Sequence, residues 1–156
     1  MNNKITIYTD GAAKGNPGRA GWAAIFFIKD KIFEIGGFLP HATNNQMELT
    51  APIEALKYLS KRHFDTNHQV EIVSDSKYVI LGITEWIKNW QRNNWRNAAK
   101  KPVLNRELWE ELHELTQELK PKWTHVEGHN GDKWNERADE IAVSFAEGNP
   151  VELKNN

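Results

Sequence analysis

The sequence predicts an α/β domain in which helices flank a mixed β-sheet. Short runs of β-branched and apolar residues, typical of strands, alternate with longer segments that have helical periodicity. Their order along the chain is three strands, a helix, a strand, several helices, a strand and a helix, which suits such a sheet. With 156 residues and no repeat or linker, we expect one domain over 1–148, followed by a polar tail at 149–156 that frays.

The strands are predicted from short apolar runs that end at turn residues. These runs are 5–9, 22–28, 32–39, 70–74 and 123–126. The glycine-rich segment 11–21, with Asn16-Pro17-Gly18 inside it, predicts a loop after the first strand. A tight turn at Asp30-Lys31 makes the second and third runs a hairpin.

Apolar residues at helical spacing predict the helices. The segments are 43–61, 76–93, 106–119 and 133–146. Thr43 or Asn44 can cap the first of them, since both side chains can accept a hydrogen bond from a free amide of the first turn. The second segment is interrupted near Gly82, a residue that weakens a helix.

Charge is distributed unevenly along the chain. The formal net charge is −1, yet residues 86–106 hold six basic and no acidic side chains, which leaves −7 on the rest. A cationic surface attracts phosphate backbones, and an acidic cluster attracts divalent metals. The absence of cysteine excludes disulfides and zinc–thiolate sites. No signal peptide or membrane span is visible in the sequence, so we expect a soluble, cytoplasmic protein.

Four acidic residues are candidates for a metal site. Asp10 and Asp75 follow predicted strands, and Glu48 and Asp139 lie on predicted helices. Ligands in open α/β sheets bind outside the carboxyl ends of the strands, where the first two would meet. Four neighbouring carboxylates repel one another unless cations neutralise them, and oxygen ligands suit magnesium or manganese. Taken singly, each acid is more commonly a turn former or a solvated side chain, so their sequence contexts decide.

Those contexts resemble the type 1 ribonucleases H, and in particular the bacterial kind with a basic protrusion. The resemblance covers residues 4–147, and five short motifs occur in the family's order. They are Asp10-Gly11-Ala12 with Gly15-Asn16-Pro17-Gly18, Thr43-Asn44-Asn45-Gln46-Met47-Glu48-Leu49, Ser74-Asp75-Ser76-Lys77-Tyr78-Val79, Gly128-His129, and Asn135-Glu136-Arg137-Ala138-Asp139. The protrusion corresponds to residues 86–105.

The resemblance implies a five-stranded mixed sheet whose first three strands are antiparallel, and a definite reaction. Asp10, Glu48, Asp75 and Asp139 would hold two Mg²⁺ ions, which Mn²⁺ can replace, at the scissile phosphate of the RNA strand in an RNA–DNA hybrid. The products would carry 5′-phosphate and 3′-hydroxyl ends. His129 falls on the family's loop histidine, which is associated with proton transfer or product release.

Further residues are candidates for substrate contact. The expected set comprises Asn16, Asn44, Asn45 and Gln46 near the RNA 2′-hydroxyls, Thr43 and Asn105 at a DNA phosphate, Trp86, Asn89 and Trp90 along the DNA strand, and Lys100 and Lys101 on the protrusion. Trp86 and Trp90 share a helix face, and we expect at least one of them to pack in the core.

Two other functions are compatible with this fold. A binding module would lack at least one of the four acids, but all four are present. A nuclease or strand-transfer enzyme that acts on DNA alone would not need the Asn44-Asn45 pair or a protrusion that carries tryptophans. The sequence therefore favours an endonuclease for hybrids, without a membrane, an obligate protein partner or a need for more than a monomer.

Overall fold

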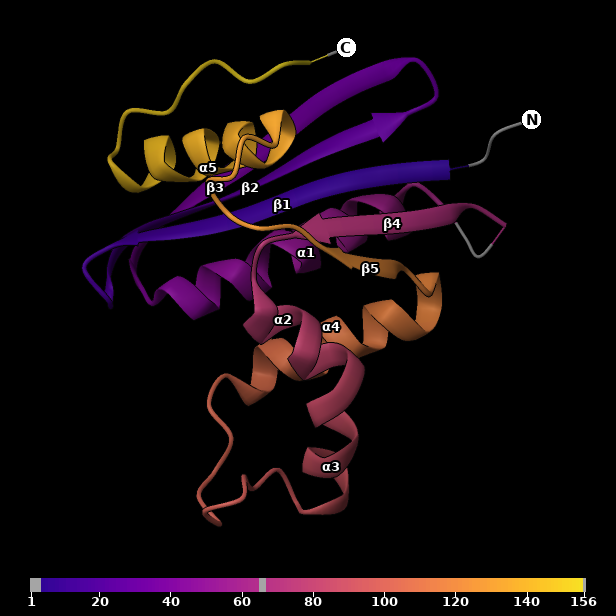
Figure 1. Cartoon of the computed structure of the whole chain (residues 1–156), viewed down its shortest axis with the longest axis vertical. Coiled ribbons are helices and arrows are strands. Elements are labelled where there is room, and N and C mark those ends of the chain that lie inside the picture. Colours follow the sequence, from indigo (N-terminus) through magenta and orange to yellow (C-terminus); the bar gives the residue numbers. More distant parts are fainter. Residues whose placement is uncertain (1–3, 65–66, 156) are drawn as a thin grey trace.

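The computed structural model describes residues 4–64 and 67–155, which form one five-stranded sheet flanked by helices (Figure 1). The strands are β1 (Lys4–Lys14), β2 (Gly18–Ile28), β3 (Lys31–Ala42), β4 (Gln69–Ser74) and β5 (Lys122–His125). Their order is β3-β2-β1-β4-β5. β1, β2 and β3 pair antiparallel, whereas β4 pairs parallel to both β1 and β5. The predicted fold class is confirmed.

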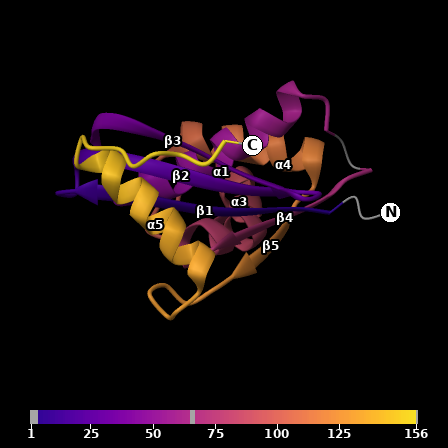
Figure 2. The ribbon, with the colours of Figure 1, turned by 90° about the horizontal axis from the view of Figure 1, so that it is seen from above.

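Helices cover both faces of the sheet (Figure 2). They are α1 (Asn44–Lys61), α2 (Lys77–Leu81), the π-helical turn η1 (Gly82–Trp86), α3 (Ile87–Arg92), α4 (Arg106–Leu119) and α5 (Lys133–Ala146). Side chains alternate between the faces of a strand, so neighbouring residues of β2 enter different cores. Phe26 packs with α1 and α4 in the larger core, and Ile25 packs beneath α5 in the smaller one. No helix within the described ranges is both long and apolar enough to cross a bilayer.

The prediction of a loop over residues 11–21 is wrong except at residues 15–17, which form the turn between β1 and β2. The β1–β2 ladder continues past Asp10, from its pairing with Ala23 to the pairing of Lys14 with Arg19. Glycine favours loops, but Gly11 and Gly21 lie inside strands, where α1 and α5 approach the backbone closely. Asp10 is therefore a residue within a strand and not the last one.

The interruption predicted at Gly82 is confirmed, and its cause is packing. A side chain at Gly82 would begin 2.1 Å from the indole of Trp109. The chain passes this fully buried tryptophan through the π-helical turn η1, which joins α2 to α3.

The tail does not fray as expected. Val151 and Leu153 pack against the smaller core beside α5. The backbone amide of Glu34 in β3 donates to the carbonyl of Lys154 at 2.8 Å, so the tail is attached to the edge strand. Apolar packing and hydrogen bonds to β3 and α5 hold the tail, and composition alone does not predict them.

Candidate active site

Three of the four predicted acids lie together beside the sheet. Asp10 lies in β1, Asp75 directly follows β4, and Glu48 lies near the start of α1. Each offers a carboxylate oxygen, and these oxygens all lie within 4.8 Å of one another. The β1–β4 ladder ends at the pair Tyr8–Val73, so Asp10 and Asp75 both follow the point where the two strands separate. The two acids therefore meet beyond the carboxyl end of β4, as expected.

Gly11 joins Asp10 to Glu48. Its backbone amide donates to the carboxylate of Asp10 at 2.9 Å and to the carboxylate of Glu48. A Cβ at this position would lie 2.4 Å from the carbonyl carbon of Met47 and 2.5 Å from the amide nitrogen of Glu48. Glycine therefore allows β1 to touch the backbone of α1, and this contact sets the two carboxylates side by side.

The start of α1 is fixed by a capping box. The Thr43 hydroxyl accepts from the Gln46 amide at 3.1 Å, and the Gln46 side chain accepts from the Thr43 amide at 2.8 Å. Of the two predicted caps, Thr43 is the one used. Because the cap fixes the first turn, it also fixes where Glu48 faces β1.

Two of the three carboxylates in the cluster are buried. Asp10 is 5% exposed and Glu48 7% exposed. Burial and then the charge of Glu48 raise the pKa of Asp10, while burial and the charge of Asp75 raise the pKa of Glu48 to about 7. Among the described residues, no lysine or arginine forms an ion pair with any of the three carboxylates. Their oxygen chemistry and their close spacing fit a hard divalent cation.

Because the pKa values of Asp10 and Glu48 are raised, we expect the metal-free protein to lose stability as the pH rises from 6 to 8. The pKa of a buried carboxyl is raised on folding, so the folded state binds more protons than the unfolded state. Stability then falls with pH by up to about 1.4 kcal/mol per pH unit for each such group. Urea unfolding in chelator at pH 6, 7 and 8 measures this slope. Added Mg²⁺ is expected to flatten it, and an equal slope with and without Mg²⁺ would contradict the assignment.

The fourth predicted acid, Asp139, lies half-buried on α5 and outside this 4.8 Å group. Its helix is nevertheless attached to the cluster, because the side-chain amide of Asn135 donates to the Asp75 carboxylate at 3.3 Å. Asn135 is 3% exposed and lies one turn before Asp139 on the same side of α5. Sequence reasoning missed Asn135, although it stands in the family motif.

His129 lies on an exposed loop that passes close to Asp75. A Cβ at the preceding residue, Gly128, would lie 2.8 Å from the Asp75 carboxylate. His129 itself has a left-handed backbone, with φ of 56°. The backbone of the residue before His129 therefore lies against the carboxylate cluster.

Hydrogen bonds connect several of the residues predicted to contact substrate. The Asn16 side chain accepts from the Asn44 amide at 2.9 Å, and the Gln46 side chain donates to that of Asn105 at 3.3 Å. Thr43, bonded to Gln46, therefore lies in one network with Asn105 although 62 positions separate them in sequence. Asn45 is exposed beside them.

A groove on the protrusion contains the other predicted group. Trp86, Asn89 and Trp90 line it together with Arg96. Trp86 is 36% exposed, whereas Trp90 packs against the larger core, as expected for at least one of the pair. Lys100 and Lys101 are exposed on the loop that follows α3.

Tyr78 connects the two groups and was missed by sequence reasoning. Its hydroxyl accepts from the Asn105 side chain and from the Trp109 indole, both at 3.2 Å. Its ring meets that of Trp86 at a centroid distance of 6.3 Å. A continuous polar and aromatic strip therefore runs from Asn16 to the protrusion.

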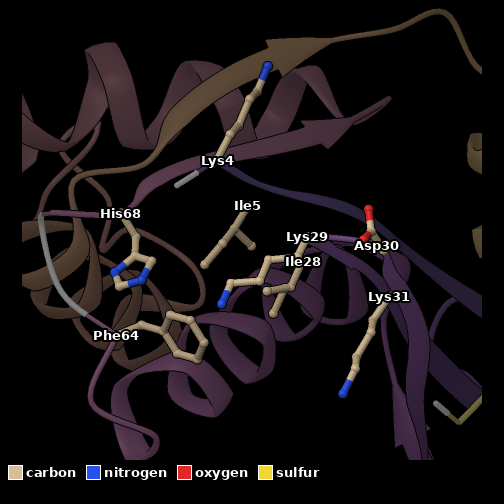
Figure 3. Close-up of a pocket in the computed structure, with 8 residues that line it drawn as sticks. All are labelled: Lys4, Ile5, Ile28, Lys29, Asp30, Lys31, Phe64 and His68. Carbon is tan, nitrogen blue, oxygen red and sulfur yellow. The ribbon is translucent and has the colours of Figure 1, made fainter. Parts of the chain in front are cut away.

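A separate pocket lies at the other end of β1 (Figure 3). Lys4, Phe64 and the turn residues 28–31 are among those that line it. Asp10 lies six positions after Lys4 along β1, a span of about 20 Å. This pocket is thus remote from the carboxylates.

Such a sheet, with a buried carboxylate cluster that fits a divalent cation, defines a metal-dependent enzyme of a nuclease fold. The profile of the RNase H family matches residues 2–147, so the chain belongs to the RNase H family and is an enzyme of the ribonuclease H class. It is 49% identical over 155 residues to a ribonuclease H of Thermosynechococcus vestitus, covering 99% of this chain and 96% of that one.

Solved structures agree with this assignment. RNase H1 of Halobacterium salinarum is 30% identical, with a TM-score of 0.70 over 93% of this chain and 98% of that one. LC11-RNase H1 in complex with an RNA/DNA hybrid shares the fold at 24% identity, with a TM-score of 0.69 over 92% of this chain and 97% of that one.

Proposed function

We propose that this enzyme hydrolyses the RNA strand of RNA–DNA hybrids at the cluster of Asp10, Glu48 and Asp75. The observation that carries the proposal is the group of three carboxylates, two of them buried, whose oxygens lie within 4.8 Å of one another. A related fold, LC11-RNase H1, has been solved with an RNA/DNA hybrid. The strip offers neutral polar groups for one strand and aromatic faces for the other.

Asp10, Glu48, Asp75 and Asp139 are proposed to hold two Mg²⁺ ions, which Mn²⁺ can replace. Bound there, the ions would lower the pKa of a water that attacks the phosphate and would stabilise the leaving 3′ oxygen, so that the products would carry 5′-phosphate and 3′-hydroxyl ends. Asp10 and Glu48 provide buried carboxylate oxygens whose positions are already fixed by the Gly11 amide. His129, on the loop beside Asp75, is proposed to move a proton to the leaving group or to assist product release.

Substrate choice is proposed to follow the two parts of the strip. Asn16, Asn44, Asn45 and Gln46 read the 2′-hydroxyls of the RNA strand, which act as both donor and acceptor. The DNA strand is proposed to follow the remaining part, where Thr43 and Asn105 bind a phosphate and Trp86, Asn89 and Trp90 line the path.

The proposal is tested with one sequence presented as RNA–DNA hybrid, RNA duplex, DNA duplex and single-stranded RNA, with each strand labelled. We expect Mg²⁺-dependent shortening of the RNA strand of the hybrid alone, with 3′-hydroxyl ends and no products in chelator. Cleavage of the DNA duplex would identify a DNA nuclease of this fold instead. Binding without cleavage would leave only a binding module.

Neutralising Lys100 and Lys101 together is expected to weaken hybrid binding and to flatten its salt dependence. Each phosphate contact releases about 0.9 of a counterion, so the slope of log K against log salt should fall by about 1 to 2. Fluorescence anisotropy between 50 and 300 mM salt measures that slope. The matched control is Lys29→Ala with Lys31→Ala, the same charge change at the remote pocket. Equal slopes for the two double variants would show that the protrusion does not meet phosphate.

A further inference from the structure

A junction of charged groups fastens α5 to the outer edge of the sheet. The Arg137 guanidinium donates from Nε and Nη2 to the two carboxylate oxygens of Glu34, at 2.8 and 2.9 Å. Glu34 lies in β3, and its side chain is only 2% exposed. Two-pronged contacts of this kind fix orientation as well as distance.

The C-terminal tail closes the same junction. Glu34 also accepts from the Lys154 amide at 2.7 Å, and Arg137 donates to the Glu152 carbonyl at 3.0 Å. Nearer the start of the tail, the backbone amide of Val151 donates to the Ser144 hydroxyl of α5 at 3.1 Å. β3, α5 and the tail therefore meet at one buried carboxylate.

The face of α5 that packs on the sheet carries small and large side chains. Ala138, Ala142 and Ala146, spaced one turn apart, are each 0% exposed and allow a close approach, so that a Cβ at Gly21 would be 2.3 Å from the Ala142 carbonyl. Ile141 and Phe145 pack in the same core. The polar contacts at the flanks of the helix add a directional constraint to this apolar packing.

The two polar attachments lie on opposite flanks of α5. Asn135 holds one flank to Asp75 of the cluster, and Arg137, about 200° further around the helix, holds the other to Glu34. Asp139 follows Asn135 by one turn and lies outside the 4.8 Å group. The rotation of α5 therefore sets the distance from Asp139 to the other three acids.

We propose that Glu34, with Arg137 and the tail, is a positioning device that fixes the rotation of α5 and thereby aligns Asp139 with the carboxylate cluster. This inference rests on the proposed function, since it needs Asp139 to act in the reaction. A carboxylate about 6 Å from the helix axis moves about 1.5 Å when the helix turns by about 15°. A misplacement of about 1 Å can cost a factor of up to about 100 in rate.

The test compares Glu34→Gln with Glu140→Gln. Both variants remove one carboxylate that contacts Arg137, but Glu140 is an exposed neighbour, three residues away on the same helix. Glu34→Gln is expected to lower kcat about tenfold or more, with little change in KM for the hybrid. It is also expected to speed hydrogen exchange of the α5 amides in the metal-free protein. Glu140→Gln should do neither. Arg137→Lys keeps the charge without the two-pronged geometry and should have the same effects as Glu34→Gln. It replaces Glu34→Gln in the test if the Glu34→Gln protein folds poorly.

A double-variant cycle distinguishes positioning from a general loss of stability. If Glu34 acts through Asp139, Glu34→Gln should lower kcat in the wild type and have almost no further effect in Asp139→Asn. An equal reduction in both backgrounds would overturn the proposal, and so would an unchanged kcat in Glu34→Gln. Should Asp139→Asn itself keep full activity, the assignment of Asp139 in the proposed function would be wrong instead.

Discussion

The Asp10→Asn variant is expected to lose hybrid cleavage by about a thousandfold or more while becoming more stable than the wild type in chelator. A thousandfold loss corresponds to about 4 kcal/mol, within the several kcal/mol that metal-ion catalysis supplies. The stability gain, on the order of 2 kcal/mol, comes from removing one of two repelling buried carboxylates whose pKa values are raised. The amide oxygen can still accept from the Gly11 amide, so the local backbone is retained.

Single-turnover cleavage and thermal melting in chelator measure the two effects on one protein preparation. For a domain of this size the melting temperature should rise by roughly 4–8 °C. Hybrid binding, measured by anisotropy, should persist because the cationic protrusion is unchanged. Asp30→Asn, on an exposed turn, is the control and should alter neither quantity. Near-normal turnover by Asp10→Asn would show that the cluster is not the catalytic centre.

The Gly11→Ala variant is expected to lose both stability and activity. The added methyl group overlaps backbone atoms of Met47 and Glu48, which cannot move away as a flexible side chain could. Overpacking against backbone should cost about 3 kcal/mol or more, and separation of β1 from α1 should draw Glu48 away from Asp10. This effect combines a packing fault with a displaced catalytic group.

Melting curves and urea unfolding test this expectation, with a predicted fall in melting temperature of roughly 6–12 °C. The control is Gly131→Ala, where no atom lies within 4 Å of the added methyl group. Its positive φ of 84° should still cost about 1 kcal/mol. A Gly11→Ala protein as stable as Gly131→Ala would mean that the contact between β1 and α1 is looser than described.

Much of the fold could be predicted because it depends on local pattern. The periodic apolar residues defined α4 and α5 with their observed bounds, and the turn near Asp30 defined the β2–β3 hairpin. The error at residues 11–21 arose because glycine occurs in two structural settings. It favours loops, but it also occurs within strands where another backbone approaches, as α1 approaches at Gly11.

The parts of the site that could not be predicted are contacts between residues far apart in sequence. Asn135 meets Asp75 across 60 positions, and Arg137 meets Glu34 across 103. Neither contact produces a periodic pattern in the sequence, because each residue is locally an ordinary polar residue of a helix or strand. The tail was mispredicted for the same reason, because its binding site on β3 and α5 exists only in the folded protein.

The most direct test of the account is an anomalous difference map from crystals soaked in Mn²⁺. The account predicts a strong peak about 2.2 Å from carboxylate oxygens of Asp10, Glu48 and Asp75, the usual range for oxygen ligands of such ions, and a weakened peak in Asp10→Asn crystals. A map with no peak there, or with an undiminished peak in the variant, would contradict the claim that these three carboxylates form the metal site of the enzyme.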